Sequence, residues 1–193
     1  MAEKPRILAF AGSARKDSYN KKLVRIAASA AEAAGAEVTL IDLLDFPLPI
    51  FNEDLEYEEG TPEHATRLKG LMVSSHGLLI ASPEYNSSIS ALLKNIIDWA
   101  SRPVPGEPRL VAFQGKVVTL MSASPGGLGG LQGLAHVRSI LGNIGAIVLP
   151  NQVATPLAYQ AFQEDGSLKD PKQQESVKTL GQGLSEFLIR LKS

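Results

Sequence analysis

The chain has 193 residues, which is enough for one well-buried domain and short for two, so we expect residues 1–193 to form a single domain. Apolar residues make up 44% and charged residues 20%, as in ordinary soluble globular proteins. A net charge of −1 without a basic run disfavours nucleic acid as a partner. The absence of cysteine excludes disulfides, thiolate nucleophiles and cysteine-ligated metals.

The N-terminal segment holds an apolar run of only five residues, 7–11, before polar residues return. This run is shorter than the core of a signal peptide, and no segment approaches the ~20 apolar residues that a membrane span needs. The sequence therefore predicts a cytoplasmic protein without a membrane span.

Five short apolar runs indicate strands, at residues 7–11, 38–43, 78–81, 117–121 and 146–149. All but the second are nearly continuous in apolar character, as expected for parallel strands that are covered on both faces. Helical periodicity fills the gaps between them. Because strand and helix alternate throughout, we predict an α/β three-layer sandwich with a five-stranded parallel sheet in the flavodoxin-like, doubly wound order.

Two of the predicted helices have one clear apolar face. In residues 18–34 this face consists of Leu23, Ile26, Ala27, Ala30 and Ala34, and Gly35 follows as a stop signal. In the last helix it consists of Val177, Leu180, Leu184, Leu188 and Leu191.

A third helix, predicted over residues 88–101, has an apolar stripe wider than one contact with a sheet needs. The stripe comprises Leu92, Leu93, Ile96, Ile97, Trp99 and Ala100. Two explanations remain open: a second surface, such as another subunit, covers the helix, or the helix lies deep in the core.

Two proline-rich stretches, 44–62 and 102–115, do not fit the alternation and are predicted to be long surface excursions. The first also carries six carboxylates. Long loops in compact domains are more often functional than idle.

Three unusual segments follow the first, third and fourth strands: GSARKDSYN (12–20), SPEYNSS (82–88) and SASPGGLGG (122–130). In a parallel sheet these segments leave the strands at the same edge, where ligands bind in doubly wound folds. Each segment alone is compatible with ordinary turn and cap chemistry. Together they predict a ligand site.

The first segment is typical of an anion-binding loop. Ser13, Ser18 and Asn20 offer neutral donors, Arg15 offers a charged fork, and the start of the following helix adds free N–H groups. The segment lacks the G-x-x-x-x-G-K-[ST] pattern of a triphosphate loop and the G-x-G-x-x-G pattern of a dinucleotide loop. The glycines at 126–133 only mimic the latter, since they follow the fourth predicted strand. A monophosphate is the simplest ligand.

The other two segments favour a flat ligand with heteroatoms. Pro83 and Pro125 stiffen them, and Gly126 and Gly127 let main-chain N–H groups approach a planar group without obstruction. Tyr85 offers an aromatic ring and Asn86 both donates and accepts. Glu84 could act as a general base, but no second acid or histidine accompanies it, which favours a structural role.

These three segments resemble the NADPH-dependent FMN reductase family of flavodoxin-like proteins, which includes chromate, quinone and azo-dye reductases. GSARKDSYN is similar to its G-S-x-R-x-x-S-x-N phosphate loop, and residues 82–99 are similar to its P-E-Y-N…L-K-N-x-I-D-W signature. SPGGLGG and LPIFNEDLE (48–56) also agree with it, so the resemblance covers nearly the whole chain.

The resemblance implies a set of FMN-binding residues: Ser13, Arg15, Ser18 and Asn20 at the phosphate; Pro83, Glu84, Tyr85 and Asn86 along the ribityl chain and ring; Ser124, Gly126 and Gly127 beside the ring. It also implies NADPH or NADH as hydride donor, a small-molecule oxidant, a ping-pong mechanism, and a homodimer or homotetramer. Because the flavin carries the redox chemistry, no catalytic side chain is expected, and none was found in the sequence.

Other functions are less compatible with the sequence. A flavodoxin-type electron carrier, the main alternative, usually has an acidic surface, whereas this chain is nearly neutral. A phospho-acceptor receiver domain needs acidic residues where Ala11–Ser13 and Ser82–Pro83 stand. A zinc site is disfavoured because His64, His76 and His136 have no ligand spacing, so no metal is expected.

Overall fold

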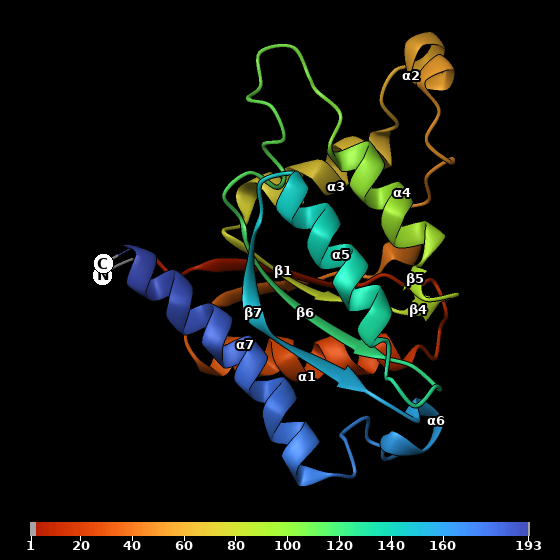
Figure 1. Cartoon of the computed structure of the whole chain (residues 1–193). Helices are drawn as coiled ribbons and strands as arrows, with labels where there is room; N and C mark the ends of the chain where they lie inside the picture. The colour runs from red at the N-terminus through yellow and green to blue at the C-terminus, as the bar shows by residue number, and fades with distance from the viewer. Residues whose placement is uncertain (1–2, 193) are drawn as a thin grey trace.

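The computed structural model describes residues 3–192 and contains a five-stranded parallel sheet (Figure 1). The strands of this sheet are β1 (Arg6–Ala11), β2 (Glu37–Leu40), β3 (Gly77–Ala81), β6 (Val117–Ala123) and β7 (Ile147–Thr155). Their order is β2-β1-β3-β6-β7, and all four neighbouring pairs are parallel. This is the doubly wound, flavodoxin-like order, so the predicted fold class is confirmed.

Helices cover both faces of the sheet. The helices are α1 (Tyr19–Ala33), α2 (Glu53–Glu59), α3 (Glu63–Ser74), α4 (Ala91–Ala100), α5 (Leu131–Asn143), α6 (Ala158–Ala161) and α7 (Pro171–Lys192), of which α2 has no buried residue and stands away from the sheet. In Figure 1, α1 and α7 lie on one side of the sheet, and α3, α4 and α5 lie on the other.

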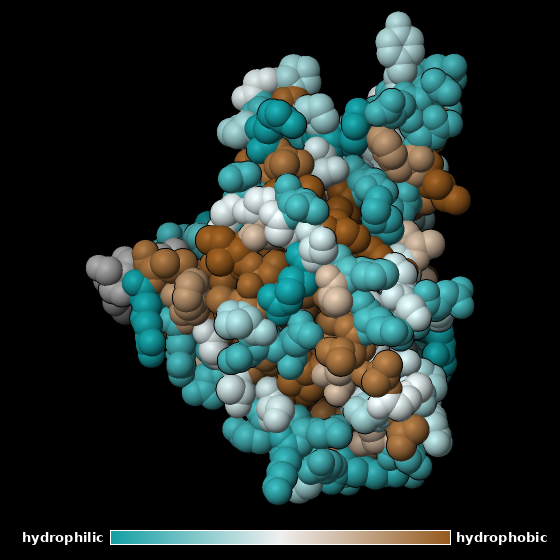
Figure 2. All heavy atoms as spheres, in the orientation of Figure 1, coloured by the Kyte–Doolittle hydropathy of each residue, from teal (hydrophilic) through white to brown (hydrophobic). Residues whose placement is uncertain are grey.

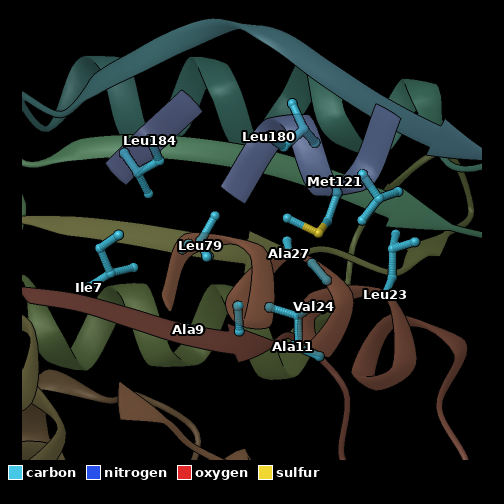
Figure 3. Close-up of a cluster of buried hydrophobic side chains, with 14 of the residues drawn as sticks. Ile7, Ala9, Ala11, Leu23, Val24, Ala27, Leu79, Met121, Leu180 and Leu184 are labelled. Atoms are coloured by element: carbon cyan, nitrogen blue, oxygen red, sulfur yellow. The ribbon is translucent and has the colours of Figure 1, made fainter. Parts of the chain in front are cut away.

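The alternation of side chains along β1 divides the core into two halves. Ile7, Ala9 and Ala11 pack toward α1 and α7, as Figure 3 shows, whereas Leu8 and Phe10 pack toward α3, α4 and α5. Every one of these five side chains is at most 3% exposed. Burial on both faces explains why the strand is a continuous apolar run.

Small residues let α1 and α7 approach closely. A β-carbon at Gly181 of α7 would overlap the main chain of Ala27 in α1, so only glycine fits at this crossing. Ala27 is fully buried there, in the same apolar cluster as Leu180 and Leu184 (Figure 3). This close packing fixes the position of α1 on the sheet. It therefore also fixes the position of the loop that precedes α1.

Several predicted boundaries differ from the structure. The strand predicted over 38–43 ends at Leu40, because Asp42 accepts a hydrogen bond from the main-chain N–H of Leu44 and starts a 3₁₀ turn, η1 (Leu43–Asp45). The strand predicted over 146–149 continues to Thr155, through an irregularity opposite 118–120. The excursion 44–62 contains the last two residues of η1 and all of α2, and α3 follows it.

The helix predicted over 88–101 begins later than expected, because residues 84–89 form a hairpin of β4 (Glu84–Tyr85) and β5 (Ser88–Ile89). Ser90 then caps α4 by accepting a hydrogen bond from the N–H of Leu93.

The wide apolar stripe of α4 is covered within the chain. Trp99 is 1% exposed, packs edge-on against Phe51 at 5.0 Å, and donates from Nε1 to the carbonyl of Pro49 at 2.8 Å. Asn95 also bonds Pro49 and Phe51. The helix α4 is therefore deep in the core. The width of its apolar stripe gives no evidence for a second subunit.

Two segments extend beyond the rest of the molecule in Figure 1: the excursion that carries α2, and the excursion 102–115. On the same face, Figure 2 shows hydrophilic side chains over most of α2 and apolar atoms gathered along β7. None of the helices in residues 3–192 is long and apolar enough to cross a membrane.

Candidate functional site

The three unusual segments lie at one edge of the sheet. The register pairs Ala11 with Ala81 and Ala81 with Met121, so β1, β3 and β6 end side by side. The segments that follow them are therefore neighbours: the first loop (12–18), the hairpin segment (82–89) and the glycine-rich loop (124–130). Side-chain hydrogen bonds join these segments, or residues that flank them, to one another: Ser90 bonds Gly12, Asn20 bonds Ala123, and Glu84 bonds Gly133.

The first loop is held against the start of α4. Ser90 Oγ donates to the carbonyl of Gly12 at 2.6 Å while it also caps α4. A β-carbon at Gly12 would lie 2.9 Å from Leu93 Cβ and 3.3 Å from Pro83 Cδ, so any side chain at residue 12 would displace α4 or the hairpin segment. The position of this loop is thus set by tertiary contacts.

The start of α1 is suited to an anion. Ser18 occupies the N-cap position and is 3% exposed, yet its hydroxyl makes no cap hydrogen bond, and the first turn of α1 has no acidic side chain. Ser13, 5% exposed, accepts from the N–H of Arg15 at 3.3 Å and keeps its own proton for another acceptor. An anion here would meet the positive end of the helix dipole together with two hydroxyls.

Arg15 supplies a cation beside this helix start. Its guanidinium lies 5.9 Å from the centre of the Tyr19 ring, and Tyr19 stacks on Phe162 at 5.8 Å with an angle of 8° between the rings. Within residues 3–192 no carboxylate pairs with Arg15, which is exposed. Its charge is therefore available to an anionic ligand.

Asn20 has a different environment from the one expected for a phosphate ligand. Its side chain is 3% exposed, its Nδ2 donates to the carbonyl of Ala123 at 2.8 Å, and its Oδ1 accepts from the N–H of Ala123 at 3.0 Å. It joins the start of α1 to the end of β6, where the glycine-rich loop begins.

The hairpin presents three exposed residues at the same edge, Tyr85, Asn86 and Ser87. Pro83 is buried at the end of β3, Tyr85 is 53% exposed, and Asn86 is exposed. Asn86 and Ser87 both have positive φ angles, +50° and +62°, which is the pattern of a two-residue type I′ turn. Neither is glycine, so the turn carries local strain while it displays Asn86.

Glu84 has a structural role that the sequence only suggested. Its Oε2 accepts a hydrogen bond from the N–H of Gly133 at 2.7 Å, in the first turn of α5. The N-cap residue of α5 is Gly130, which has no side chain to perform this function. The hairpin thereby caps α5, and no local sequence signal could have revealed a partner 49 residues away.

Glycines in the glycine-rich loop fall into two groups. Gly129 and Gly130 have φ angles of +64° and +93°, and a β-carbon at Gly129 would lie 2.7 Å from the main chain of Thr155 and Pro156. The fold itself requires these glycines. At Gly127 nothing lies within 4 Å of such a β-carbon, and at Gly126 only Ser124 Oγ does, at 3.8 Å. Their bare main chain faces open space.

A cavity of about 920 Å³ lies elsewhere, between α1, α7 and residues 164–167. Its lining includes acidic and basic side chains, among them Arg25, Glu175 and Lys178, and none of the expected site residues. The three loops instead form an open rim. Within residues 3–192 no group of three or more histidine, aspartate or glutamate side chains could hold a metal ion.

This sheet order, with an uncapped helix start and a bare glycine-rich loop at its carboxyl edge, defines a protein of the flavodoxin-like class, in which mononucleotides bind at that edge.

Comparison with known proteins identifies the family. The sequence pattern of the NADPH-dependent FMN reductases matches residues 5–160. An NAD(P)H-dependent FMN reductase of Pseudomonas aeruginosa is 34% identical over 193 residues, and a quinone reductase of Escherichia coli K12 is 30% identical over 194; both alignments cover 100% of each chain. The structure of FerB, a flavoenzyme NAD(P)H:(acceptor) oxidoreductase of Paracoccus denitrificans, superposes with a TM-score of 0.80 at 28% identity, covering 96% of this chain and 98% of that one.

The chain belongs to the NADPH-dependent FMN reductase family, and it is an oxidoreductase of the type that uses FMN and NAD(P)H. The resemblance inferred from the sequence motifs is confirmed.

Proposed function

We propose that this chain is an FMN-dependent NAD(P)H oxidoreductase that reduces quinones, flavins, chromate or azo compounds by a ping-pong hydride mechanism, within a single domain. One observation carries the proposal: an uncapped helix start beside Arg15, which has no carboxylate partner within residues 3–192, shares one sheet edge with the bare main chain of Gly126 and Gly127. The two features suit the phosphate and the flat ring of one mononucleotide. Relatives that are quinone reductases support the acceptor class.

In this proposal the chain's own residues bind and orient the cofactor. Ser13, Arg15 and Ser18 would hold the phosphate, Pro83, Glu84, Tyr85 and Asn86 would line the ribityl chain and ring, and Ser124, Gly126 and Gly127 would flank the ring. Glu84 would contribute through its main chain, because its carboxylate is bonded to Gly133. Main-chain N–H groups of the glycine-rich loop would stabilise negative charge on the ring.

Bound FMN would accept a hydride from NAD(P)H and pass the electrons to the oxidant, which is the chemistry that the cofactor supplies. The protein is then required to leave one ring face open, so that the nicotinamide can depart before the oxidant arrives. The open rim and the exposed Tyr85 and Asn86 are compatible with this requirement.

The test begins with a visible spectrum of the FMN-loaded protein before and after anaerobic NADPH or NADH. Rapid bleaching supports an oxidoreductase, whereas a flavodoxin-type carrier would react too slowly to be useful. Steady-state rates with a quinone, free FMN, chromate and an azo dye then rank the acceptors. Parallel double-reciprocal plots are expected for a ping-pong mechanism, and intersecting plots would contradict it.

We also propose that the chain forms a homodimer or homotetramer. Its other binding partners would be small molecules. Ile50 and Tyr57, on the α2 excursion, are 86% and 92% exposed, and contact with a second subunit would remove these large apolar side chains from water. Light scattering measures the oligomeric state directly. The double variant I50S/Y57S should shift it toward the monomer, and a wild-type monomer at micromolar concentration would contradict the proposal.

A further inference from the structure

The main-chain ladder between β3 and β6 stops one step before β6 ends. The N–H of Ser82 still donates to the carbonyl of Met121 at 2.8 Å. After Ser82 the chain turns through Pro83 into the hairpin, and among residues 3–192 no further main-chain bond from this strand to β6 follows. The N–H and carbonyl of Ala123 on this side of β6 therefore have no strand to bond, although Ala123 is only 3% exposed.

The side chain of Asn20 takes the place of the missing strand. Its amide gives one donor and one acceptor to the same residue, with distances of 2.8 Å to the carbonyl and 3.0 Å from the N–H of Ala123. An amide is the side-chain group that offers both functions in one plane at this spacing. Without it, two main-chain groups would be buried unpaired, which is unfavourable.

This bond pair also spans the candidate site. Asn20 is the second residue of α1, directly behind the first loop, and Ala123 directly precedes the glycine-rich loop. Any change in the pair would change the separation of the two loops that, under the proposed function, hold opposite ends of FMN.

We propose that Asn20 is a positioning residue that sets the distance between the first loop and the glycine-rich loop, and that it does not contact the phosphate of the cofactor. The proposal rests on the proposed function. It differs from the resemblance-based assignment of Asn20 as a fourth phosphate ligand beside Ser13, Arg15 and Ser18.

Riboflavin separates the two roles, because it has the ring and ribityl chain of FMN but no phosphate. A phosphate ligand contributes to FMN binding alone. A positioning residue contributes to both flavins equally, since both need the ring and ribityl contacts at the correct distance.

The experiment titrates apoprotein with FMN and with riboflavin, followed by quenching of flavin fluorescence. N20A is expected to lower both affinities by the same factor, about tenfold for two lost hydrogen bonds. R15A is the matched control: it should lower the affinity for FMN and leave that for riboflavin unchanged. If N20A lowers only the affinity for FMN, or neither affinity, the positioning role is wrong.

N20D provides a second test that does not depend on the stability of N20A. At neutral pH the introduced carboxylate can still accept a hydrogen bond from the N–H of Ala123. It has no donor for the carbonyl of Ala123, and the two oxygens repel each other. Protonation restores the donor, so riboflavin affinity of N20D should recover severalfold as the pH falls toward 4, relative to wild type. A constant ratio of the two affinities across this pH range would overturn the proposal.

The outcomes for the proposed function are distinct. If the wild-type apoprotein binds neither flavin, the proposed function fails and the role of Asn20 fails with it. If wild type binds both flavins and N20A discriminates between them, only the role of Asn20 fails.

Discussion

Glu84 of the hairpin caps helix α5 by accepting a hydrogen bond from the main-chain N–H of Gly133 at 2.7 Å. A carboxylate at a helix start is stabilised both by this charge-assisted bond and by the helix dipole. The same contact joins the segment that displays Tyr85 and Asn86 to the helix that follows the glycine-rich loop. Glu84 therefore couples local stability to the shape of the candidate site.

Replacing Glu84 tests this cap. E84A should lower the free energy of unfolding by about 1–2 kcal/mol, as for other lost N-caps, whereas E84Q keeps an oxygen acceptor and should lose less than half of that. Urea denaturation of the apoprotein measures both. Equal losses for E84A and E84Q would show that the charge, and not the hydrogen bond, stabilises the contact. E84A with wild-type stability would contradict the cap altogether.

Arg15 should dominate the binding of the phosphate. R15A is expected to weaken FMN binding by about 1.5–3 kcal/mol, the range for a hydrogen bond to a charged group, because no carboxylate neutralises Arg15 in residues 3–192. Isothermal titration calorimetry gives the difference. Lys16 is the control, since it is an exposed cation in the same loop. If K16A and R15A weaken binding equally, the effect is general electrostatics and the assignment of Arg15 fails.

The two groups of glycines should respond differently to alanine. G129A should lower the free energy of unfolding by about 1–3 kcal/mol. The φ of +64° at Gly129 and its contact with the main chain of Thr155 and Pro156 leave no room for a side chain. G127A should change stability by no more than about 0.5 kcal/mol, since open space surrounds that position.

For flavin affinity, in contrast to stability, we expect the effect to appear at Gly127. The methyl group of G127A would project into the region where the ring is proposed to lie, so FMN affinity should fall although the protein is as stable as wild type. Thermal melts of the apoprotein and FMN titrations together give both quantities. Unchanged FMN affinity in G127A would move the ring away from this loop.

The pair of Lys21 and Asp42 predicts a component of acid sensitivity. Lys21 Nζ lies 2.6 Å from Asp42 Oδ2, and the Lys21 side chain is 6% exposed. Burial raises the pKa of Asp42, but the hydrogen bonds from Lys21 and from the N–H of Leu44, with the charges of Lys21 and Arg25, outweigh it and place the pKa below the ordinary 3.8. The folded protein therefore binds this proton less tightly than the unfolded chain.

The sign of the effect follows from that difference. The contribution of Asp42 to stability is fully present above the unfolded pKa of 3.8 and is lost as the pH falls through the lower folded value. Because Asp42 is partly exposed, D42N should cost about 1 kcal/mol or less at pH 7, and this cost should shrink as the pH falls below 3.8. Urea denaturation across this pH range is the measurement. D45N, at an exposed neighbouring carboxylate, should leave the curve unchanged, and an equal effect of D45N would remove the special role of the pair.

Much of the fold was predictable because it depends on short-range patterns. Continuous apolar runs marked β1, β3 and β6, and the unusual residues after them marked the binding edge, since parallel strands must end together. The weakest predictions lay where polar or short segments compete with periodicity. The hairpin at 84–89 depends on two positive φ angles at Asn86 and Ser87, which non-glycine residues seldom adopt.

By itself, the sequence determined the layers, the strand order, the edge of the sheet where the ligand-binding residues gather, and the family. These follow from hydrophobic period and from motifs that lie within a few residues. Tertiary structure alone decided which polar side chains at that edge remain available to a ligand. Asn20 and Glu84 meet main-chain partners 103 and 49 residues away, and Trp99 bonds its own chain's Pro49. Buried polar groups must be paired wherever the fold brings them together, and no local pattern specifies that partner.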